Sequence, residues 1–202
     1  MFALLEAAGW PIWPLVLASI IALAIIGERA WSLRSSIVAP RGLLGQVVKE
    51  YRQNGANPEL LSRLANGAPL AKVFATGLKN VQSTPQVMKE AIDETGRSVA
   101  HELERFLTTL GTIATISPLL GLLGTVIGMI EIFGSQTPTG SNPIVLAHGI
   151  SIALYNTAMG LIVAIPSMIF YRHYRNQVDS LVIEMESEAV KLVEILHGER
   201  RS

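Results

Sequence analysis

Three long stretches of the chain contain no Asp, Glu, Lys or Arg. They cover residues 7–27, 106–130 and 132–171. Each one is as long as, or longer than, the roughly 20 residues that an α-helix needs to cross the hydrocarbon core of a bilayer. The third stretch begins with the turn-rich sequence GSQTPTGSNP, so its helix is expected to begin after that loop. The pattern therefore predicts an all-α membrane protein with three transmembrane helices, near residues 11–27, 107–133 and 149–171.

The polar segment between the first two spans has a helical pattern that is broken at NGANP, NGAP and QSTP. Ser83 or Thr84, just before Pro85, is expected to cap a helix that begins at the proline. No breaker follows until Pro118. We therefore expect that helix to run without interruption into the second span, so that the second and third spans both extend into the cytoplasm as long helices.

Beyond the third span, apolar residues recur at alternating spacings of four and three, which is typical of a helix-packing seam. These residues are Val178, Val182, Met185, Ala189, Leu192 and Leu196. Such a seam requires a partner helix. Two partners fit the pattern equally well: the loop helices of the same chain, or a neighbouring subunit.

The basic residues predict how the chain is oriented. All 16 Lys and Arg residues lie within 28–105 or 172–202. Cytoplasmic segments are enriched in Lys and Arg, so the N-terminus is expected outside and the C-terminus in the cytoplasm. The predicted divisions are a periplasmic N-terminus with the first span (1–27), a cytoplasmic helical loop (28–106), a channel core of two spans and a short periplasmic loop (107–171), and a cytoplasmic C-terminal helix (172–202).

Composition excludes several kinds of site. The chain contains no cysteine, which excludes disulfides and thiolate metal ligands, and we expect neither a metal nor a cofactor. Its 16 basic residues are balanced by 16 acidic ones and are dispersed among them, which argues against nucleic-acid binding. His148 and Ser151 are close in sequence but lack a GxSxG motif, so we do not expect an enzyme.

The second and third spans are rich in small and polar residues. In the second span, Ala114, Pro118, Gly121, Thr125 and Gly128 share one helical face, and Gly124 forms a GxxxG pair with Gly128. Small residues let membrane helices approach closely, so Gly121, Gly124, Gly128 and Gly160 are predicted to pack helices together. The polar side chains of Thr125, Asn156 and Thr157 are candidates to line a narrow ion pathway.

The motifs SPLLGLLGTVIGM and NTAMGLIVAIP, together with the three-span layout, resemble the TolQ/ExbB/MotA family of proton-channel proteins. This resemblance implies a ring-forming subunit of the inner membrane that assembles as a pentamer. A dimeric single-span partner of the ExbD/TolR type would lie in its central pore. Ion flow would then power work through a TonB- or TolA-type protein, or flagellar rotation. Thr125 and Thr157 match the family's pore-facing threonines.

The chain departs from the family pattern at Ile152, where ExbB and TolQ members typically carry a glutamate. Its spans have no Asp, Glu or Lys in their middle, although ionisable groups usually mark an ion relay. The resemblance therefore implies that the partner supplies the carboxylate. An ExbB-like role in TonB-dependent transport fits best, with a TolQ-like subunit, a MotA-like sodium or proton stator and a structural membrane scaffold as alternatives.

Overall fold

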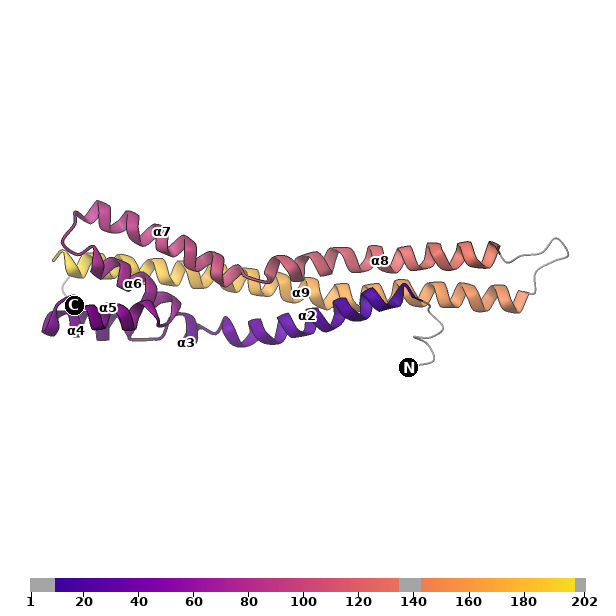
Figure 1. Cartoon of the computed structure of the whole chain (residues 1–202), viewed down its shortest axis with the longest axis horizontal. Coiled ribbons are helices and arrows are strands. Elements are labelled where there is room, and N and C mark those ends of the chain that lie inside the picture. Colours follow the sequence, from indigo (N-terminus) through magenta and orange to yellow (C-terminus); the bar gives the residue numbers. More distant parts are fainter. Residues whose placement is uncertain (1–9, 135–142, 199–202) are drawn as a thin grey trace. The chain divides into compact units, whose positions relative to one another are not determined.

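The computed structural model describes residues 10–134 and 143–198, and α-helix is the only regular secondary structure within them. Figure 1 shows their order along the chain. The helices are α2 (Ile12–Ser32), α3 (Ser35–Val38), α4 (Leu43–Asn54), α5 (Pro58–Ala65), α6 (Pro69–Lys79), α7 (Pro85–Glu104), α8 (Leu107–Gly134) and α9 (Pro143–Leu196). The predicted periplasmic loop falls at residues 135–142, which lie outside the described residues.

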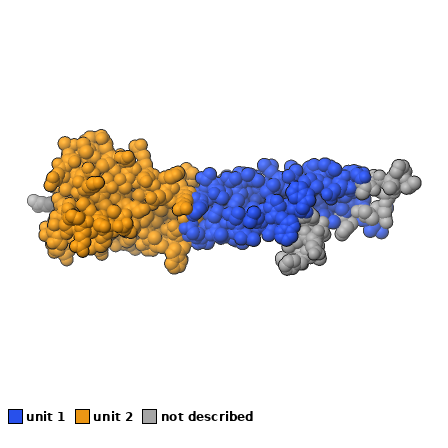
Figure 2. Space-filling model, viewed as in Figure 1, with its two compact units in different colours: residues 1–28, 106–173 blue, residues 29–105, 174–202 orange. Residues whose placement is uncertain are grey.

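The chain divides into two compact units, coloured blue and orange in Figure 2. The first unit comprises the described parts of residues 1–28 and 106–173, and the second comprises those of 29–105 and 174–202. Helix α9 contributes residues to both units. The first unit contains the uncharged stretches, and the second contains nearly all of the charged side chains.

The structure confirms three helices that are long and apolar enough to cross a membrane, one each from α2, α8 and α9. Their outward surfaces carry large apolar side chains, as a lipid-facing surface requires. On α8 these include Leu119, Leu122, Leu123, Val126, Ile130 and Phe133. Helix α9 begins six residues before the predicted start and continues to Leu196, so the predicted long extension of the third span is confirmed.

The predicted continuous helix from Pro85 into the second span is interrupted at one point. Helix α7 ends at Glu104 and α8 begins at Leu107. Between them Phe106 has φ +66°, a left-handed conformation that costs a non-glycine residue free energy. The prediction was wrong here because neither a glycine nor a proline marks the break.

Three polar contacts within the second unit join the helices around this end of α7. Arg29 is only 5% exposed, and its Nη1 donates a hydrogen bond of 3.1 Å to the carbonyl of Leu103. A helix end leaves its last carbonyls without helical donors, and Arg29 satisfies one of them. Gln177 similarly donates to the carbonyl of Leu33 at 2.8 Å, and Arg175 pairs with Glu104 at 3.4 Å.

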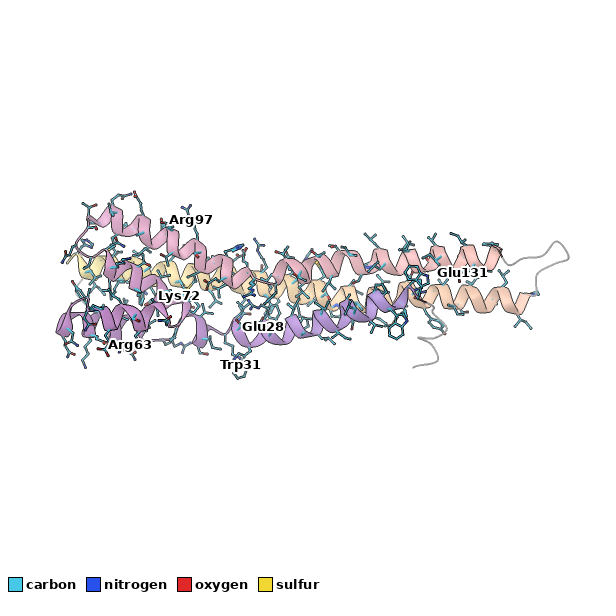
Figure 3. All side chains as sticks on the ribbon, in the orientation of Figure 1. Glu28, Trp31, Arg63, Lys72, Arg97 and Glu131 are labelled. Atoms are coloured by element: carbon cyan, nitrogen blue, oxygen red, sulfur yellow. The ribbon has the colours of Figure 1, made fainter. Side chains whose placement is uncertain are left out.

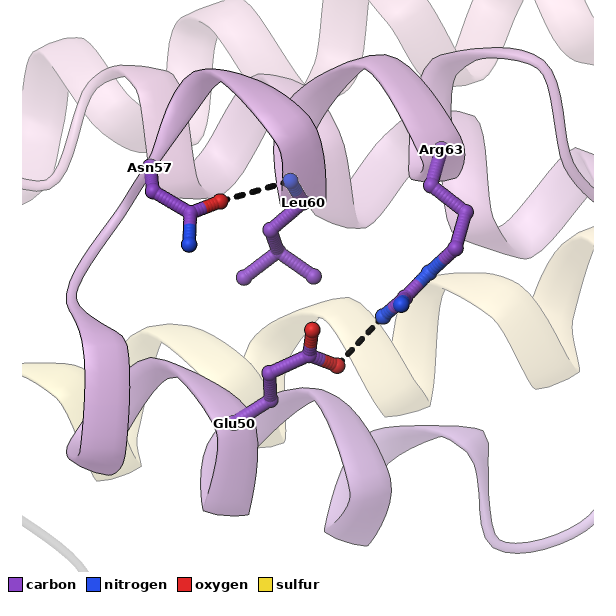
Figure 4. A network of polar contacts seen from close by, with 4 residues as sticks. All are labelled: Glu50, Asn57, Leu60 and Arg63. Atoms are coloured by element: carbon purple, nitrogen blue, oxygen red, sulfur yellow. Dashed lines mark hydrogen bonds and ion pairs between the residues drawn. The ribbon is translucent and has the colours of Figure 1, made fainter.

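The breaks predicted in the polar segment are confirmed. Helix α4 ends at Asn54 and is followed by Gly55 with φ +67°. The side chain of Asn57 then accepts a hydrogen bond from the backbone N–H of Leu60, which caps α5. An ion pair between Arg63 and Glu50 joins α5 to α4 (Figure 4). Of the two candidate caps for α7, Thr84 is the one that accepts a bond from Val87.

The tail of α9 packs on the loop helices of its own chain. Its apolar side chains are buried, among them Val178, Leu181, Met185, Ala189 and Leu192. A Cβ placed on Gly77 of α6 would lie 3.2 Å from side-chain atoms of Ile92, Met88 and Leu192, so α6, α7 and α9 meet at this glycine. Of the two partners that the sequence left open for the apolar face of the tail, the structure shows the loop helices of the same chain.

Candidate ion pathway at the contact of α8 and α9

Helices α8 and α9 lie side by side in the first unit and approach closely where both carry small residues (Figure 1). A Cβ placed on Gly121 would lie 2.7 Å from the backbone oxygen of Asn156, and one on Gly160 would lie 2.6 Å from that of Ser117. Such distances leave no room for a side chain. We call this contact the α8–α9 seam. It is formed by Ser117, Gly121, Gly124 and Gly128 of α8 with Ala153, Asn156, Thr157 and Gly160 of α9.

The distance between α8 and α9 varies along the seam. A Cβ on Gly124 would lie 2.7 Å from the Cβ of Asn156, whereas one on Gly128 would lie 3.3 Å from that of Ala153. The backbones are therefore closest around Gly121 and Gly160 and separate slightly toward Gly128. All four predicted packing glycines lie at this contact between two helices of one chain.

The face of α8 that contacts α9 is shifted by one residue, at two points, from the face predicted from the sequence. Gly121 and Gly128 belong to both, but Ser117 and Gly124 lie in the seam, next to Pro118 and Thr125 of the face predicted from the sequence. Ser117 was not singled out as a site residue. Its spacing of four from Gly121 was the signal that would have found it.

The three candidate pathway residues occupy different surroundings. Asn156 is 2% exposed and packs against Gly124. The hydroxyl oxygen of Thr157 is also buried and has no hydrogen-bond partner among the described residues. Thr125 is half-buried, and its hydroxyl donates to the carbonyl of Leu122 at 2.6 Å. The structure therefore brings Asn156 and Thr157 together in the seam and leaves Thr125 at its edge, next to Gly124.

Within the described parts of the first unit, Asp, Glu, Lys and Arg occur on α8 and α9 only near the ends of the uncharged stretches. Glu131, near the end of α8, is exposed (Figure 3). Ile152 is half-buried on α9, and the side chain of His148 lies outside the described residues. Just beyond the third span, burial raises the pKa of the Tyr174 phenol above its ordinary value. No group of three His, Asp or Glu side chains in the described ranges is arranged to hold a metal ion.

Two comparisons with known proteins bear on this arrangement. The sequence pattern of the MotA/TolQ/ExbB proton channel family matches residues 65–187, which include α8 and the part of α9 that forms the seam. An ExbB-like biopolymer transport protein of Synechocystis is 36% identical over 168 residues, covering 81% of this chain and 79% of that protein.

Two further relatives carry the names of two different systems. The biopolymer transport protein exbB1 of Vibrio cholerae is 33% identical over 81% of this chain and 74% of its own length. The Tol-Pal system protein TolQ of Pseudomonas aeruginosa is 31% identical over 74% of this chain and 67% of its own length. With three apolar helices, a glycine-lined seam and these matches, the chain belongs to the MotA/TolQ/ExbB proton channel family.

Proposed function

We propose that this chain is the ring-forming subunit of an ion-driven motor in the inner membrane. In this proposal several copies, most simply five, surround a dimeric single-span partner of the ExbD/TolR type. Ion flow through the assembly couples the proton motive force to TonB-dependent transport at the outer membrane. Family membership supports the channel role, and the names of the Synechocystis and Vibrio cholerae relatives support the transport role.

One observation supports the assignment of different roles to the ring and to the partner. The uncharged middle of each span contains no carboxylate, yet the seam holds the buried polar side chains of Asn156 and Thr157. Hydroxyl and amide oxygens can coordinate a cation or a water chain, but they do not exchange protons as a carboxylate does. We therefore assign the titrating group to the partner and the oxygen lining to Thr125, Asn156 and Thr157 of this chain.

The exposed apolar faces support assembly within the bilayer. The glycines of the seam pack α8 against α9 of the same chain. Contacts between subunits are therefore expected at the outer faces of α2, α8 and α9, which carry exposed Leu, Ile and Val side chains. We propose a periplasmic N-terminus, a cytoplasmic loop at 28–106 and a cytoplasmic tail from residue 172, because every Lys and Arg lies in those two segments.

A TolQ-like role in the envelope is the second candidate, and the Pseudomonas aeruginosa relative favours it. A MotA-like stator driven by sodium or protons is a third. These candidates differ in the partner that the ring holds. Purification of the native complex, followed by identification of the bound single-span protein and of any TonB- or TolA-type protein, separates them. Absence of any single-span partner would instead favour a structural scaffold.

Thr157→Val tests the pathway assignment in the complex with its partner. The substitution keeps the shape of the side chain and removes a hydroxyl that bonds no described group, so the fold should be retained. We expect the variant complex to assemble but to lose proton flux in liposomes, whereas Thr157→Ser should retain much of it.

Thr112→Val is the matched control. Thr112 is exposed on α8, and its hydroxyl donates to the carbonyl of Thr108 at 2.9 Å within the same helix. The control should conduct like the wild type. Full flux in Thr157→Val, or loss of flux only through loss of the oligomer, would show that the Thr157 hydroxyl has no role in the pathway.

A further inference from the structure

The end of α2 carries an exposed pair of side chains, Trp31 and Arg34. Trp31 lies in the last turn of the helix and is 65% exposed, and its side chain projects outward from α2 (Figure 3). The guanidinium carbon of Arg34 lies 4.7 Å from the centroid of the Trp31 ring. This distance is within the roughly 6 Å that defines a cation–π contact. We call these two residues the Trp–Arg pair.

Trp31 belongs to an apolar strip on the outside of α2. Trp13 precedes it by 18 residues, so helical geometry puts both on the same face of α2, about 27 Å apart along the axis. Trp13 and Ile20, which lies between them on that face, are exposed. The spacing is close to the roughly 30 Å of a bilayer core, and tryptophan is enriched at both of its surfaces. The strip therefore fits lipid, and other exposed side chains of α2, such as Leu23, remain for contacts between subunits.

Arg34 differs from two other arginines of the second unit in its partners. Arg29 donates to the carbonyl of Leu103, and Arg175 pairs with Glu104. The guanidinium of Arg34 makes no ion pair or hydrogen bond with any described group, and its contact is the ring of Trp31. Its positive charge is therefore available to an anion from outside the chain.

The surroundings of Arg34 leave its donors accessible. The neighbouring hydroxyl of Ser35 lies 3.5 Å from Glu184, and that carboxylate makes no ion pair with Arg34. A guanidinium that stacks on an aromatic ring keeps its N–H donors at its edge, where their geometry matches a phosphate. Ile37 begins the next turn, with its backbone N–H bonded to the carbonyl of Arg34 at 2.8 Å, and its side chain is also exposed. Apolar contacts thus lie on both sides of Arg34 in the sequence.

We propose that the Trp–Arg pair binds the headgroup of an acidic phospholipid. Arg34 donates to the phosphate, while Trp31 and Ile37 contact the glycerol and the upper part of the acyl chains. A zwitterionic lipid binds less tightly because its own ammonium group competes with Arg34 for the phosphate. In the proposed topology this lipid belongs to the cytoplasmic leaflet, where acidic lipids attract basic residues. Its binding does not depend on ion conduction.

Native mass spectrometry of the full chain tests the selectivity. The micelles contain equal amounts of phosphatidylglycerol and phosphatidylcholine with the same acyl chains, so a retained lipid reports a site and not a charged membrane surface. We expect Arg34→Gln to lower the ratio of bound phosphatidylglycerol to phosphatidylcholine several-fold. Arg172→Gln is the matched control, since Arg172 is also exposed beside a span, has no described partner and has no aromatic contact. Equal ratios in the wild type and Arg34→Gln, or equal losses in the two variants, would overturn the proposal.

Fluorescence locates the lipid at Trp31. Replacing Trp10 and Trp13, both exposed, by Phe leaves Trp31 as the single tryptophan of the chain. In phosphatidylcholine vesicles, a small fraction of brominated phosphatidylglycerol should quench Trp31 more than the same fraction of brominated phosphatidylcholine. Arg34→Gln in this background should make the two equal. No quenching by either lipid would show that protein covers Trp31, and equal quenching before the substitution would show no selectivity; each result contradicts the proposal.

Inorganic phosphate distinguishes a lipid from a free anion. Because it has no acyl chain to contact Trp31 and Ile37, millimolar phosphate should leave the preference for phosphatidylglycerol in place. Loss of the preference would show a site for free anions and would overturn the lipid assignment. Neither measurement involves the partner or ion flux, so a complex that fails to conduct would count against the proposed function alone.

Discussion

At the scale of single residues, Gly121 and Gly160 determine whether α8 and α9 can pack. A Cβ at either position would lie within 2.7 Å of a backbone oxygen of the facing helix, which cannot move without separating the helices. We expect Gly121→Ala and Gly160→Ala each to lower the free energy of unfolding by about 1–3 kcal/mol. Gly128→Ala is the control, because its Cβ would lie 3.3 Å from that of Ala153. Equal losses in all three variants, measured by unfolding in detergent, would contradict the geometry.

Gly124→Leu should reduce the yield of the proposed oligomer more than Leu122→Ala does. The leucine at position 124 would overlap the side chain of Asn156, whereas Leu122 is 55% exposed and its trimming removes only surface contacts. Since the seam lies within one chain, the monomer should lose stability together with the oligomer. Native mass spectrometry and a thermal melt measure the two effects, and equal oligomer yields for the two variants would refute the expectation.

The sequence identified the composition of the seam but not the surroundings of each hydroxyl. Thr125 and Thr157 look alike in sequence, yet one hydroxyl bonds its own helix and the other is buried without a described partner. That difference depends on how α8 and α9 are rotated about their axes. Small residues spaced three and four apart leave this rotation uncertain by one residue position. Ser117 was missed for the same reason.

At the scale of elements, Arg29 stabilises the break between α7 and α8. Its buried guanidinium donates to the carbonyl of Leu103, and a hydrogen bond from a charged group contributes about 1.5–3 kcal/mol. Arg29→Met should lower the unfolding free energy by roughly that amount. Arg41→Met removes the same charge from an exposed position and should change stability little. Similar effects of the two variants would show that the Leu103 contact contributes nothing.

Breaks between helices could be predicted where glycine, asparagine or proline disfavours a continuous helix. The breaks after α4, α5 and α6 contain glycine or asparagine, or end at a proline that begins the next helix. All three were located from the sequence. The break at Arg105 and Phe106 has no such residue. Its stability depends on tertiary contacts such as that of Arg29, which join residues far apart in the chain.

At the scale of the whole molecule, the distribution of Lys and Arg predicts which segments face the cytoplasm. The chain has no native cysteine, so single cysteines can report topology without interference. An impermeant thiol reagent added to intact spheroplasts should label Trp10→Cys but neither Ser98→Cys nor Ser187→Cys, all three being exposed positions. After lysis all three should react. Labelling of Ser98→Cys from outside would reverse the proposed topology.

The number of subunits and the identity of the partner could not be derived from the fold of one chain. The outer faces of α8 and α9 are apolar in much the same way whether they meet lipid or another subunit, so burial and hydropathy do not distinguish the two. The resemblance of SPLLGLLGTVIGM and NTAMGLIVAIP to a known family was the part of the sequence that indicated an assembly at all.

Proton flux with and without the partner tests the central claim most directly. The middle of each span has no Asp, Glu or Lys, so the proposed ring by itself in liposomes under a proton gradient should conduct little. Addition of the proposed single-span partner, which would supply the carboxylate, should produce flux, and Thr157→Val in this chain should abolish it. Flux through the ring alone that equals flux through the complex would contradict the account, because the pathway would then need no carboxylate from the partner.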